Sequence, residues 1–138
     1  MIRFTDTLTG ISEAMLEGFF EGWPDPPSPP THLRILRSSA HVVLAVDDQA
    51  GRVAGFINAI SDGIMCAYIP LLEVLPEYRG RGIGSELTER MLRRLGDLYM
   101  VDLMCDPSVL GFYETRGMKP AQGAVVRHFD RQSCGARS

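Results

Sequence analysis

Residues 74–84 read Val-Leu-Pro-Glu-Tyr-Arg-Gly-Arg-Gly-Ile-Gly and join two segments of different periodicity. The apolar run 64–75 predicts a buried strand, and the pattern over 83–95 predicts an amphipathic helix. The three glycines permit a tight turn and a close approach of the backbone to a ligand. The helix adds free N–H groups and the positive end of its dipole in the first turn. This connection therefore predicts an anion site, most naturally for a phosphate or pyrophosphate.

Spacing excludes two common phosphate-binding motifs. A P-loop requires a lysine directly after its last glycine, whereas Ser85 follows Gly84. A dinucleotide fingerprint requires Gly-x-Gly-x-x-Gly, whereas a single residue separates each glycine from the next here. That fingerprint also belongs to the first strand–helix turn of a doubly wound sheet, and this loop lies past the middle of the chain.

Two segments of the chain resemble one known family. The loop closely resembles the coenzyme A loop of the GNAT superfamily of N-acetyltransferases, which reads Gln/Arg-x-x-Gly-x-Gly/Ala and is matched by Arg79, Gly82 and Gly84. Residues 106–118 resemble a later segment of the same family, Asn-x-x-Ala-x-x-Phe/Leu-Tyr-x-x-x-Gly-Phe. The matching residues there are Phe112, Tyr113 and Gly117, and the departures are Asp106, Val109 and Met118.

The resemblance implies an α/β (α+β) fold of the GNAT-like acyl-CoA N-acyltransferase type. Its central sheet would be mixed and mostly antiparallel, with about six or seven strands flanked by about four helices. The 138 residues correspond to about one domain. We assign residues 1–130 to a single N-acetyltransferase domain and residues 131–138 to a polar C-terminal tail.

Periodicity and turn residues predict the elements in more detail. The expected helices span 10–20, 31–38 (capped by Thr31), 83–95 and 107–116, and the expected strands span 2–5, 41–46, 52–60, 64–75 and 98–105, with one or two more in 117–129. In the helix 83–95, Glu86 with Arg90 and Glu89 with Arg93 have the spacing of supportive ion pairs. Pro70 interrupts the strand 64–75, and the resemblance explains it by a bulge where this strand splays from its neighbour and opens a slot for the cofactor.

Composition narrows the class of protein. Hydrophobic residues make up 45% and charged residues 22%, an ordinary soluble profile, and the net charge of −3 argues against a nucleic-acid partner. The sequence shows no secretory signal and no apolar run long enough for a membrane span, so we expect a cytoplasmic protein with no membrane partner. Cys66 and Cys105 lie in apolar runs and are expected to be buried free thiols, and no metal motif is present.

The resemblance implies acetyl-CoA as the co-substrate, without a metal. Main-chain N–H groups of the loop would bind its pyrophosphate, and they belong to Arg79, Gly80, Arg81, Gly82, Ile83, Gly84 and Ser85. The main chain of Leu72 and Val74 would bind the pantetheine arm as an added strand does. The N–H of Val74 would stabilise the developing oxyanion.

Two side chains are the main catalytic candidates. Tyr113 matches the family's general acid, and the usual pKa of a phenol, near 10, keeps it protonated at neutral pH. Glu73 is the best candidate for the general base because it is a lone acid in an apolar strand, although a salt-bridge role is an alternative. The weaker candidates are Asp62, Tyr68, Asp102 and Asp106, and His41 is expected to be structural.

These residues predict an N-acetyltransferase that moves an acetyl group to a primary amine by direct attack in a ternary complex. The alternatives are a non-catalytic CoA-binding or sensory module on the same fold, and an interaction protein whose glycine loop is structural. The acceptor would be the amine of a small molecule or peptide, and Trp23 with the proline loop 22–30 either forms its pocket wall or is a packed connection. A homodimer is consistent with base rates, but the sequence identifies no surface for it.

Overall fold

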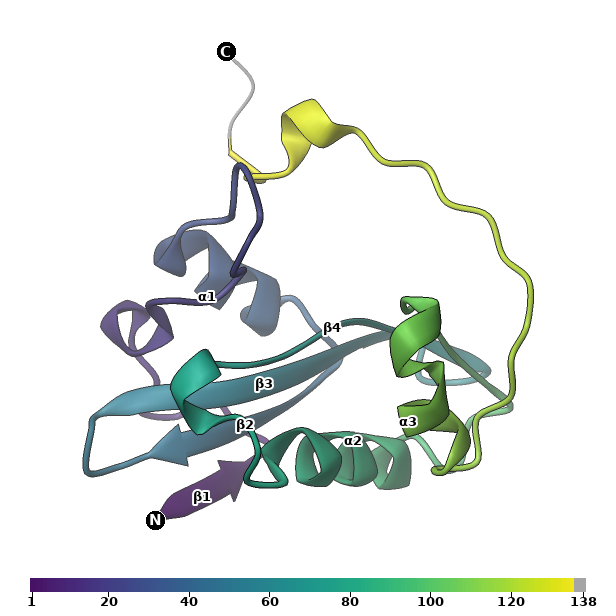
Figure 1. Cartoon of the computed structure of the whole chain (residues 1–138), viewed down its shortest axis with the longest axis horizontal. Coiled ribbons are helices and arrows are strands. Elements are labelled where there is room, and N and C mark those ends of the chain that lie inside the picture. Colours follow the sequence, from purple (N-terminus) through teal and green to yellow (C-terminus); the bar gives the residue numbers. More distant parts are fainter. Residues whose placement is uncertain (136–138) are drawn as a thin grey trace.

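The computed structural model describes residues 1–135 and is built on one five-stranded sheet (Figure 1). The strands lie in the order of the chain: β1 (Ile2–Thr5), β2 (His41–Asp47), β3 (Arg52–Ser61), β4 (Cys66–Val74) and β5 (Met100–Leu103). Neighbouring strands from β1 to β4 pair antiparallel, whereas β4 and β5 pair parallel. The sheet is therefore mixed and mostly antiparallel, as the sequence predicts.

Helices cover both faces of this sheet. The α-helices are α1 (Pro29–Arg37), α2 (Ile83–Arg94) and α3 (Leu110–Glu114), and short 3-10 turns occupy Glu13–Leu16, Pro76–Tyr78, Pro107–Val109 and Phe129–Arg131. Figure 1 shows α2 along one face and α1 with the first 3-10 turn along the other. The parallel β4–β5 pair needs a long crossover, and α2 supplies it.

The central strands and α2 are stabilised because their apolar side chains are buried in the core between the sheet and the helices. Ile83, Leu87, Met91 and Leu95 recur on one side of α2 and are all buried, which confirms the amphipathic pattern. Gly55 lets this helix approach β3, since a Cβ there would lie 3.2 Å from Leu87 Cδ1 and 3.2 Å from Val74 Cγ2.

Strand β4 separates from β5 at Pro70, as expected. Parallel pairing between the two strands ends at Ile69 and Leu103. On the other side of β4 the register changes between Tyr68 and Leu71, where β4 carries one residue more than β3. Proline has no N–H for a sheet ladder, so a bulge at a strand that has lost one neighbour accommodates it.

The element count corrects the sequence-based expectation. Residues 1–135 contain five strands and three α-helices, not six or seven strands and four helices. The helix expected over 10–20 is reduced to Glu13–Leu16, and Gly10 and Gly18 flank it with φ of +78° and +94°, outside helical backbone. The strands expected within 117–129 do not form, because no neighbouring strand in the described chain pairs with this segment.

Several local details also differ from the predictions. Helix α1 starts earlier than expected, and Ser28 rather than Thr31 is its N-cap residue. Arg90 pairs with Glu86 as expected, but Arg93 also approaches Glu86, at 3.7 Å, instead of Glu89. Cys66 is a free thiol but exposed rather than buried, because the β4 end that carries it lies at the rim of the sheet.

The helices of the described chain are short, and its C-terminal tail contacts the segment 17–28, here called the N-terminal loop. The longest helix among residues 1–135 is α2, with 12 residues, and no helix in this part of the chain is long and apolar enough to cross a membrane. The polar tail predicted over 131–138 is described as far as Gly135, and residues 136–138 lie outside the described residues. Within it, the Gln132 side chain accepts a hydrogen bond from the Asp25 N–H at 2.9 Å.

Candidate functional site

A cavity of about 570 Å³ lies where β4 and β5 separate. Its walls come from distant parts of the sequence, represented by Trp23 in the N-terminal loop, Glu73 on β4, Asp106 after β5, Tyr113 on α3 and Arg127 near the C-terminus. The structure thus brings both predicted catalytic side chains, Glu73 and Tyr113, to one cavity. Leu72 and Arg79 also line it.

Within residues 1–135, no strand pairs with the cavity-facing edge of β4 beyond Ile69. The N–H of Leu75 donates to the carbonyl of Ala54 on β3 at 2.8 Å. Because main-chain groups alternate in direction along a strand, those of Leu72 and Val74 point away from β3, toward the side from which β5 has departed. The Arg79 Nε atom donates to the Val74 carbonyl at 3.0 Å on that side. An extended ligand can therefore pair with this edge of β4 as an added strand does.

The glycine loop next to it is an open cradle of N–H groups. Gly80 and Gly82 have φ of +79° and +77°, and a Cβ at either position would meet no atom within 4 Å. Gly82 is the N-cap of α2, and its carbonyl accepts from the Glu86 N–H at 3.1 Å. In the described part of the chain, the N–H groups of residues 80–85 have no protein acceptor. Together with the helix dipole, they form a site suited to a pyrophosphate.

The two loop arginines are engaged within the protein. Arg79 donates from Nη2 to the Glu21 carboxylate at 2.7 Å, in addition to its bond to Val74. Arg81 lies over the ring of Tyr78, with 5.3 Å between its Cζ and the ring centroid. Arg79 therefore links the end of β4 to the N-terminal loop, a role that its place in the glycine motif does not reveal.

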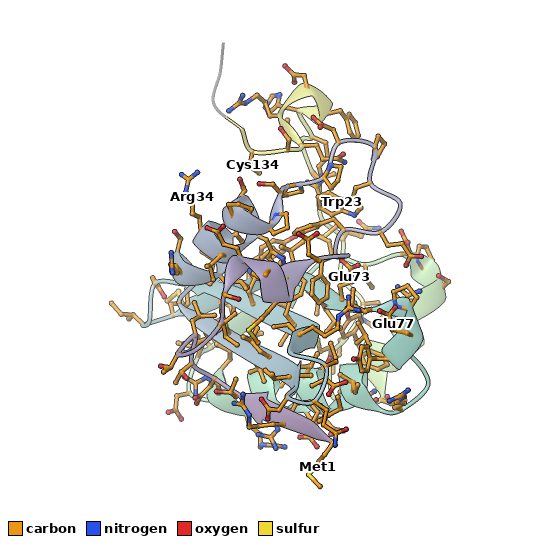
Figure 2. The ribbon with its side chains drawn as sticks, turned by 90° about the vertical axis from the view of Figure 1, so that its left-hand side faces the viewer. Met1, Trp23, Arg34, Glu73, Glu77 and Cys134 are labelled. Carbon is orange, nitrogen blue, oxygen red and sulfur yellow. The ribbon has the colours of Figure 1, made fainter. Side chains whose placement is uncertain are left out.

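Glu73 holds the same N-terminal loop against the sheet. Its carboxylate accepts hydrogen bonds from the N–H groups of Phe20 at 2.8 Å and Glu21 at 3.3 Å. Figure 2 shows Glu73 and Trp23 on the same side of the sheet. A carboxylate has about four acceptor positions, so two N–H bonds leave it able to accept a proton from a ligand. Trp23 lines the cavity and is 39% exposed, so it is a wall residue rather than a core residue.

Tyr113 enters the cavity from α3. Its side chain is buried, and burial raises the pKa of its phenol, with a further contribution from nearby Cys105 and an opposing one from Arg116. A raised pKa keeps the hydroxyl protonated at neutral pH, which is the state required of a proton donor.

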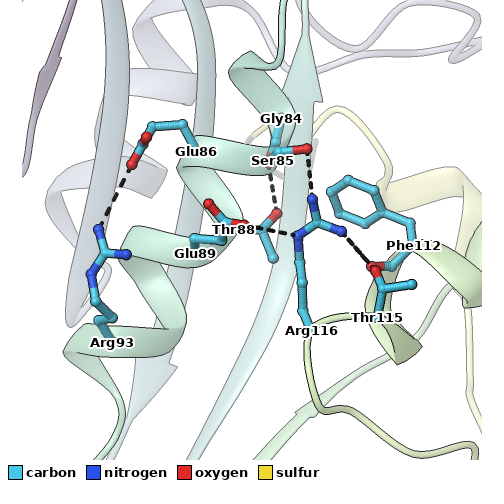
Figure 3. A network of polar contacts seen from close by, with 9 residues as sticks. All are labelled: Gly84, Ser85, Glu86, Thr88, Glu89, Arg93, Phe112, Thr115 and Arg116. Carbon is cyan, nitrogen blue, oxygen red and sulfur yellow. Dashed lines mark hydrogen bonds and ion pairs between the residues drawn. The ribbon is translucent and has the colours of Figure 1, made fainter.

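Arg116 is a site-supporting residue that the sequence reasoning missed. Figure 3 shows it between α3 and the start of α2. It donates to Ser85 Oγ and to the Phe112 carbonyl, each at 2.7 Å, and its Nε lies 3.8 Å from Glu89. Its guanidinium also stacks on the Phe112 ring at 3.9 Å. These contacts join the helix that carries Tyr113 to the helix that carries the N–H cradle. No local spacing in the sequence signals the contact with Ser85, which is 31 residues away.

The weaker candidates for catalytic residues differ in whether they lie at the cavity. Asp106 lines the cavity, whereas Asp62, Tyr68, Asp102 and His41 do not. Asp62 accepts from three main-chain N–H groups of its own turn, and hydrogen bonds from Ile64, Met65 and Cys66 lower its pKa. His41, on β2, has its Nδ1 3.3 Å from Arg94 Nη2, away from the cavity. Among residues 1–135, no group of three or more His, Cys, Asp or Glu side chains is placed to hold a metal.

The similar proteins of known sequence are named as N-acetyltransferases. The chain matches an uncharacterised ycf52-like N-acetyltransferase of Prochlorococcus marinus with 36% identity over 73 residues, which is 51% of this chain and 41% of that protein. It matches the chloroplastic GCN5-related N-acetyltransferase 2 of Arabidopsis thaliana with 34% identity over 73 residues, 51% of this chain and 28% of that protein. The matched region thus spans less than half the length of these curated relatives.

Solved structures extend the likeness to the whole chain. A crystal structure assigned as an acetyltransferase from Deinococcus radiodurans R1 superposes with a TM-score of 0.93 and 52% identity, covering 99% of this chain and 94% of that one. A GNAT family acetyltransferase from Streptococcus pneumoniae TIGR4 superposes with a TM-score of 0.71 and 25% identity, covering 93% and 98%.

The family model described as the acetyltransferase (GNAT) family matches residues 8–118, which contain the glycine cradle, the free edge of β4 and Tyr113. On this match and the structural likeness, the chain belongs to the GNAT acetyltransferase family.

Proposed function

We propose that this protein is an acetyl-CoA-dependent N-acetyltransferase that acetylates a primary amine. One observation carries the proposal: a main-chain edge left free by the departure of β5 lies beside a glycine cradle whose N–H groups have no acceptor in residues 1–135. A long ligand with a diphosphate at one end and an amide-rich arm at the other fits both features. Acetyl-CoA has this chemistry and supplies an acetyl thioester as the acyl donor.

We assign the binding of acetyl-CoA to main-chain groups. The N–H groups of residues 80–85 hold the pyrophosphate at the N-terminus of α2, where the helix dipole adds to the hydrogen bonds. Leu72 and Val74 pair with the pantetheine arm along β4. The Arg79 N–H, which the sequence reasoning included in this cradle, donates instead to the Pro76 carbonyl at 3.2 Å. The Arg79 side chain keeps the N-terminal loop in place.

The acceptor amine enters from the side of Trp23 and the N-terminal loop. The carboxylates of Glu73 and Asp106 and the indole of Trp23 line this part of the cavity, and they favour a cationic amine of a small molecule or peptide. Glu73, directly or through a water, accepts a proton from the amine, because a protonated amine cannot attack the thioester. The fixed hydrogen bonds from Phe20 and Glu21 hold this carboxylate in position.

Two further groups act as the amine attacks. The N–H of Val74 donates a hydrogen bond to the carbonyl oxygen as negative charge develops on it. The Tyr113 hydroxyl donates its proton to the sulfur as the carbon–sulfur bond breaks, so the thiol leaves neutral. The nitrogen loses one more proton to solvent as the amide forms, and Tyr113 recovers a proton from solvent. The products are the acetylated amine and the free thiol.

The test combines binding with turnover for the wild type and Tyr113→Phe. We expect calorimetry to show binding of acetyl-CoA but not of ATP or NAD, and an amine panel to identify an acceptor. Tyr113→Phe is expected to lower kcat about a hundredfold, with the acetyl-CoA Kd unchanged, because only the proton donor is lost. Absence of acetyl-CoA binding to the folded protein would refute the proposal. Binding without turnover or thioester hydrolysis would favour a non-catalytic CoA-binding module.

A further inference from the structure

The C-terminal part of the chain adds a cation to the wall of the cavity. Residues 119–128, here called the C-terminal segment, follow α3 and return above α1 (Figure 1). Val125 and Arg127 of this segment line the cavity. Just beyond it, the Gln132 side chain accepts from the Asp25 N–H at 2.9 Å, so the segment ends beside the N-terminal loop. Arg127 therefore lies on the side of the cavity to which we assign the acceptor.

The guanidinium of Arg127 has no acidic partner among residues 1–135. Its Nη1 donates to the carbonyl of the adjacent Val126 at 3.3 Å, and none of the ion pairs in this part of the chain includes it. Arg79, the other arginine at the cavity, is instead paired with Glu21 at 2.7 Å. An arginine presents N–H donors in a planar fork that matches a carboxylate or a phosphate. Arg127 is therefore the arginine that can bind an anionic group of a ligand in the cavity.

The pyrophosphate of acetyl-CoA has a separate site. The N–H groups that we propose to hold it belong to residues 80–85, at the start of α2, and none of these six residues lines the cavity. The glycine loop and the C-terminal segment thus offer positive charge at two different places. The charge at Arg127 is available to the acceptor.

The same cavity also offers negative charge for the amine. The Asp106 carboxylate lines it and forms no ion pair among residues 1–135, and Glu73 keeps acceptor positions beyond its two main-chain hydrogen bonds. Acidic and basic groups that face one cavity without pairing with each other are complementary to a ligand that carries both charges. Trp23 and Met104 add apolar surface to the lining.

We propose that the acceptor is an amine that also carries an anionic group, a carboxylate or a phosphate, and that Arg127 binds this group. Glu73 and Asp106 attract the ammonium, while Trp23 and Met104 contact the apolar part of the molecule. An amino acid with an apolar side chain is the simplest compound of this class. The inference rests on the proposed acetyltransferase function and adds a specificity-determining residue to it.

The test compares acceptors that differ in one group. L-Tyrosine is tyramine with an added carboxylate, and O-phosphoethanolamine is ethanolamine with an added phosphoryl group. At saturating acetyl-CoA, release of the CoA thiol gives kcat/KM for each amine. We expect the wild type to favour the anionic member of at least one pair by about tenfold, because a charge-assisted bond to Arg127 forms. The pair that shows the preference distinguishes a carboxylate from a phosphate.

Variants of the C-terminal segment locate the cause of this preference. Arg127→Gln should abolish it, and Arg127→Lys, which keeps the charge but not the planar fork, should retain part of it. Lys119→Gln is the matched control, because it removes a positive charge from the same segment at a position that does not line the cavity. The ratio of the two kcat/KM values is the readout, since general damage to the site slows both amines and leaves their ratio unchanged.

Three results would overturn the inference while leaving the proposed function intact. They are equal kcat/KM values within both pairs for the wild type, a preference that survives Arg127→Gln, and a preference that Lys119→Gln reduces as much. A weaker acetyl-CoA affinity of Arg127→Gln with an unchanged preference would assign Arg127 to the cofactor instead. Failure of the folded wild type to bind acetyl-CoA, or to acetylate any amine, contradicts the proposed function itself, and the inference is then wrong as well.

Discussion

Two parts of the candidate site, here called the main-chain wall and the side-chain wall, are built by different means. The glycine cradle and the edge of β4 use main-chain groups that are close in sequence, within residues 72–85. The N-terminal loop is instead held by side chains that lie more than 50 residues away in the sequence. Glu73 accepts from the main chain of Phe20, and Arg79 binds Glu21. The first wall can recognise a ligand common to the family. The second wall can change its residues without disturbing the first, so it is the natural place for acceptor specificity.

The largest expected effect comes from breaking the main-chain wall. Gly82→Val introduces a β-branched side chain at φ of +77°, which forces the loop to change shape. We expect acetyl-CoA binding to weaken about a thousandfold, or about 4 kcal/mol, through loss of two or more charge-assisted hydrogen bonds. Calorimetric titration gives the Kd directly.

Gly51→Val is the matched control for this change. Gly51 has φ of +67°, and a Cβ there would meet no atom within 4 Å, so the backbone strain is similar, but the residue lies in the β2–β3 turn. Both variants should lose similar stability in thermal unfolding, and only Gly82→Val should lose affinity. Equal affinity of the two variants would contradict the assignment of the cradle.

Sequence reasoning succeeded where the signals are local. The glycine loop, α2 and the strands β2 and β3 follow from turn residues and periodicity within short windows, and all are present. It failed where the cause is distant: residues 117–129 have strand sequence but no neighbour in the described chain, and the residues around Met15 have helical spacing but are bounded by left-handed glycines. Arg116 and the loop-holding role of Glu73 depend on contacts across the fold, which no spacing encodes.

The side-chain wall is expected to be the more acid-sensitive of the two. His32 is buried against Phe19, Phe20 and Phe56, with ring centroids 5.4, 4.9 and 4.4 Å away, and its ring nitrogens have no partner among residues 1–135. Burial lowers its pKa from 6.5 to about 4. The unfolded chain therefore binds the proton first, so the contribution of neutral His32 to stability is complete above pH 6.5 and is lost as the pH falls through 4.

The expected loss is about 3 kcal/mol between pH 7 and pH 4. Urea unfolding at these two pH values measures it, and His32→Phe, which cannot titrate, should remove most of the difference. His128→Gln is the control, because the His128 side chain is exposed and its replacement should leave the acid dependence unchanged. An acid dependence that persists in His32→Phe would assign the effect to carboxylates instead.

The smallest of these effects shows whether Glu73 acts as the general base or only positions the N-terminal loop. Glu73→Gln keeps one oxygen that can accept from the Phe20 N–H but cannot take a proton from the amine. If Glu73 is the base, kcat should fall about a hundredfold and the acidic limb of the pH–rate profile should move, with the acetyl-CoA Kd unchanged. Glu21→Gln removes a neighbouring acid that pairs with Arg79, and should leave that limb in place. A Glu73→Gln enzyme with lower stability but an unmoved acidic limb would show that Glu73 only positions the loop, and that a water takes the proton.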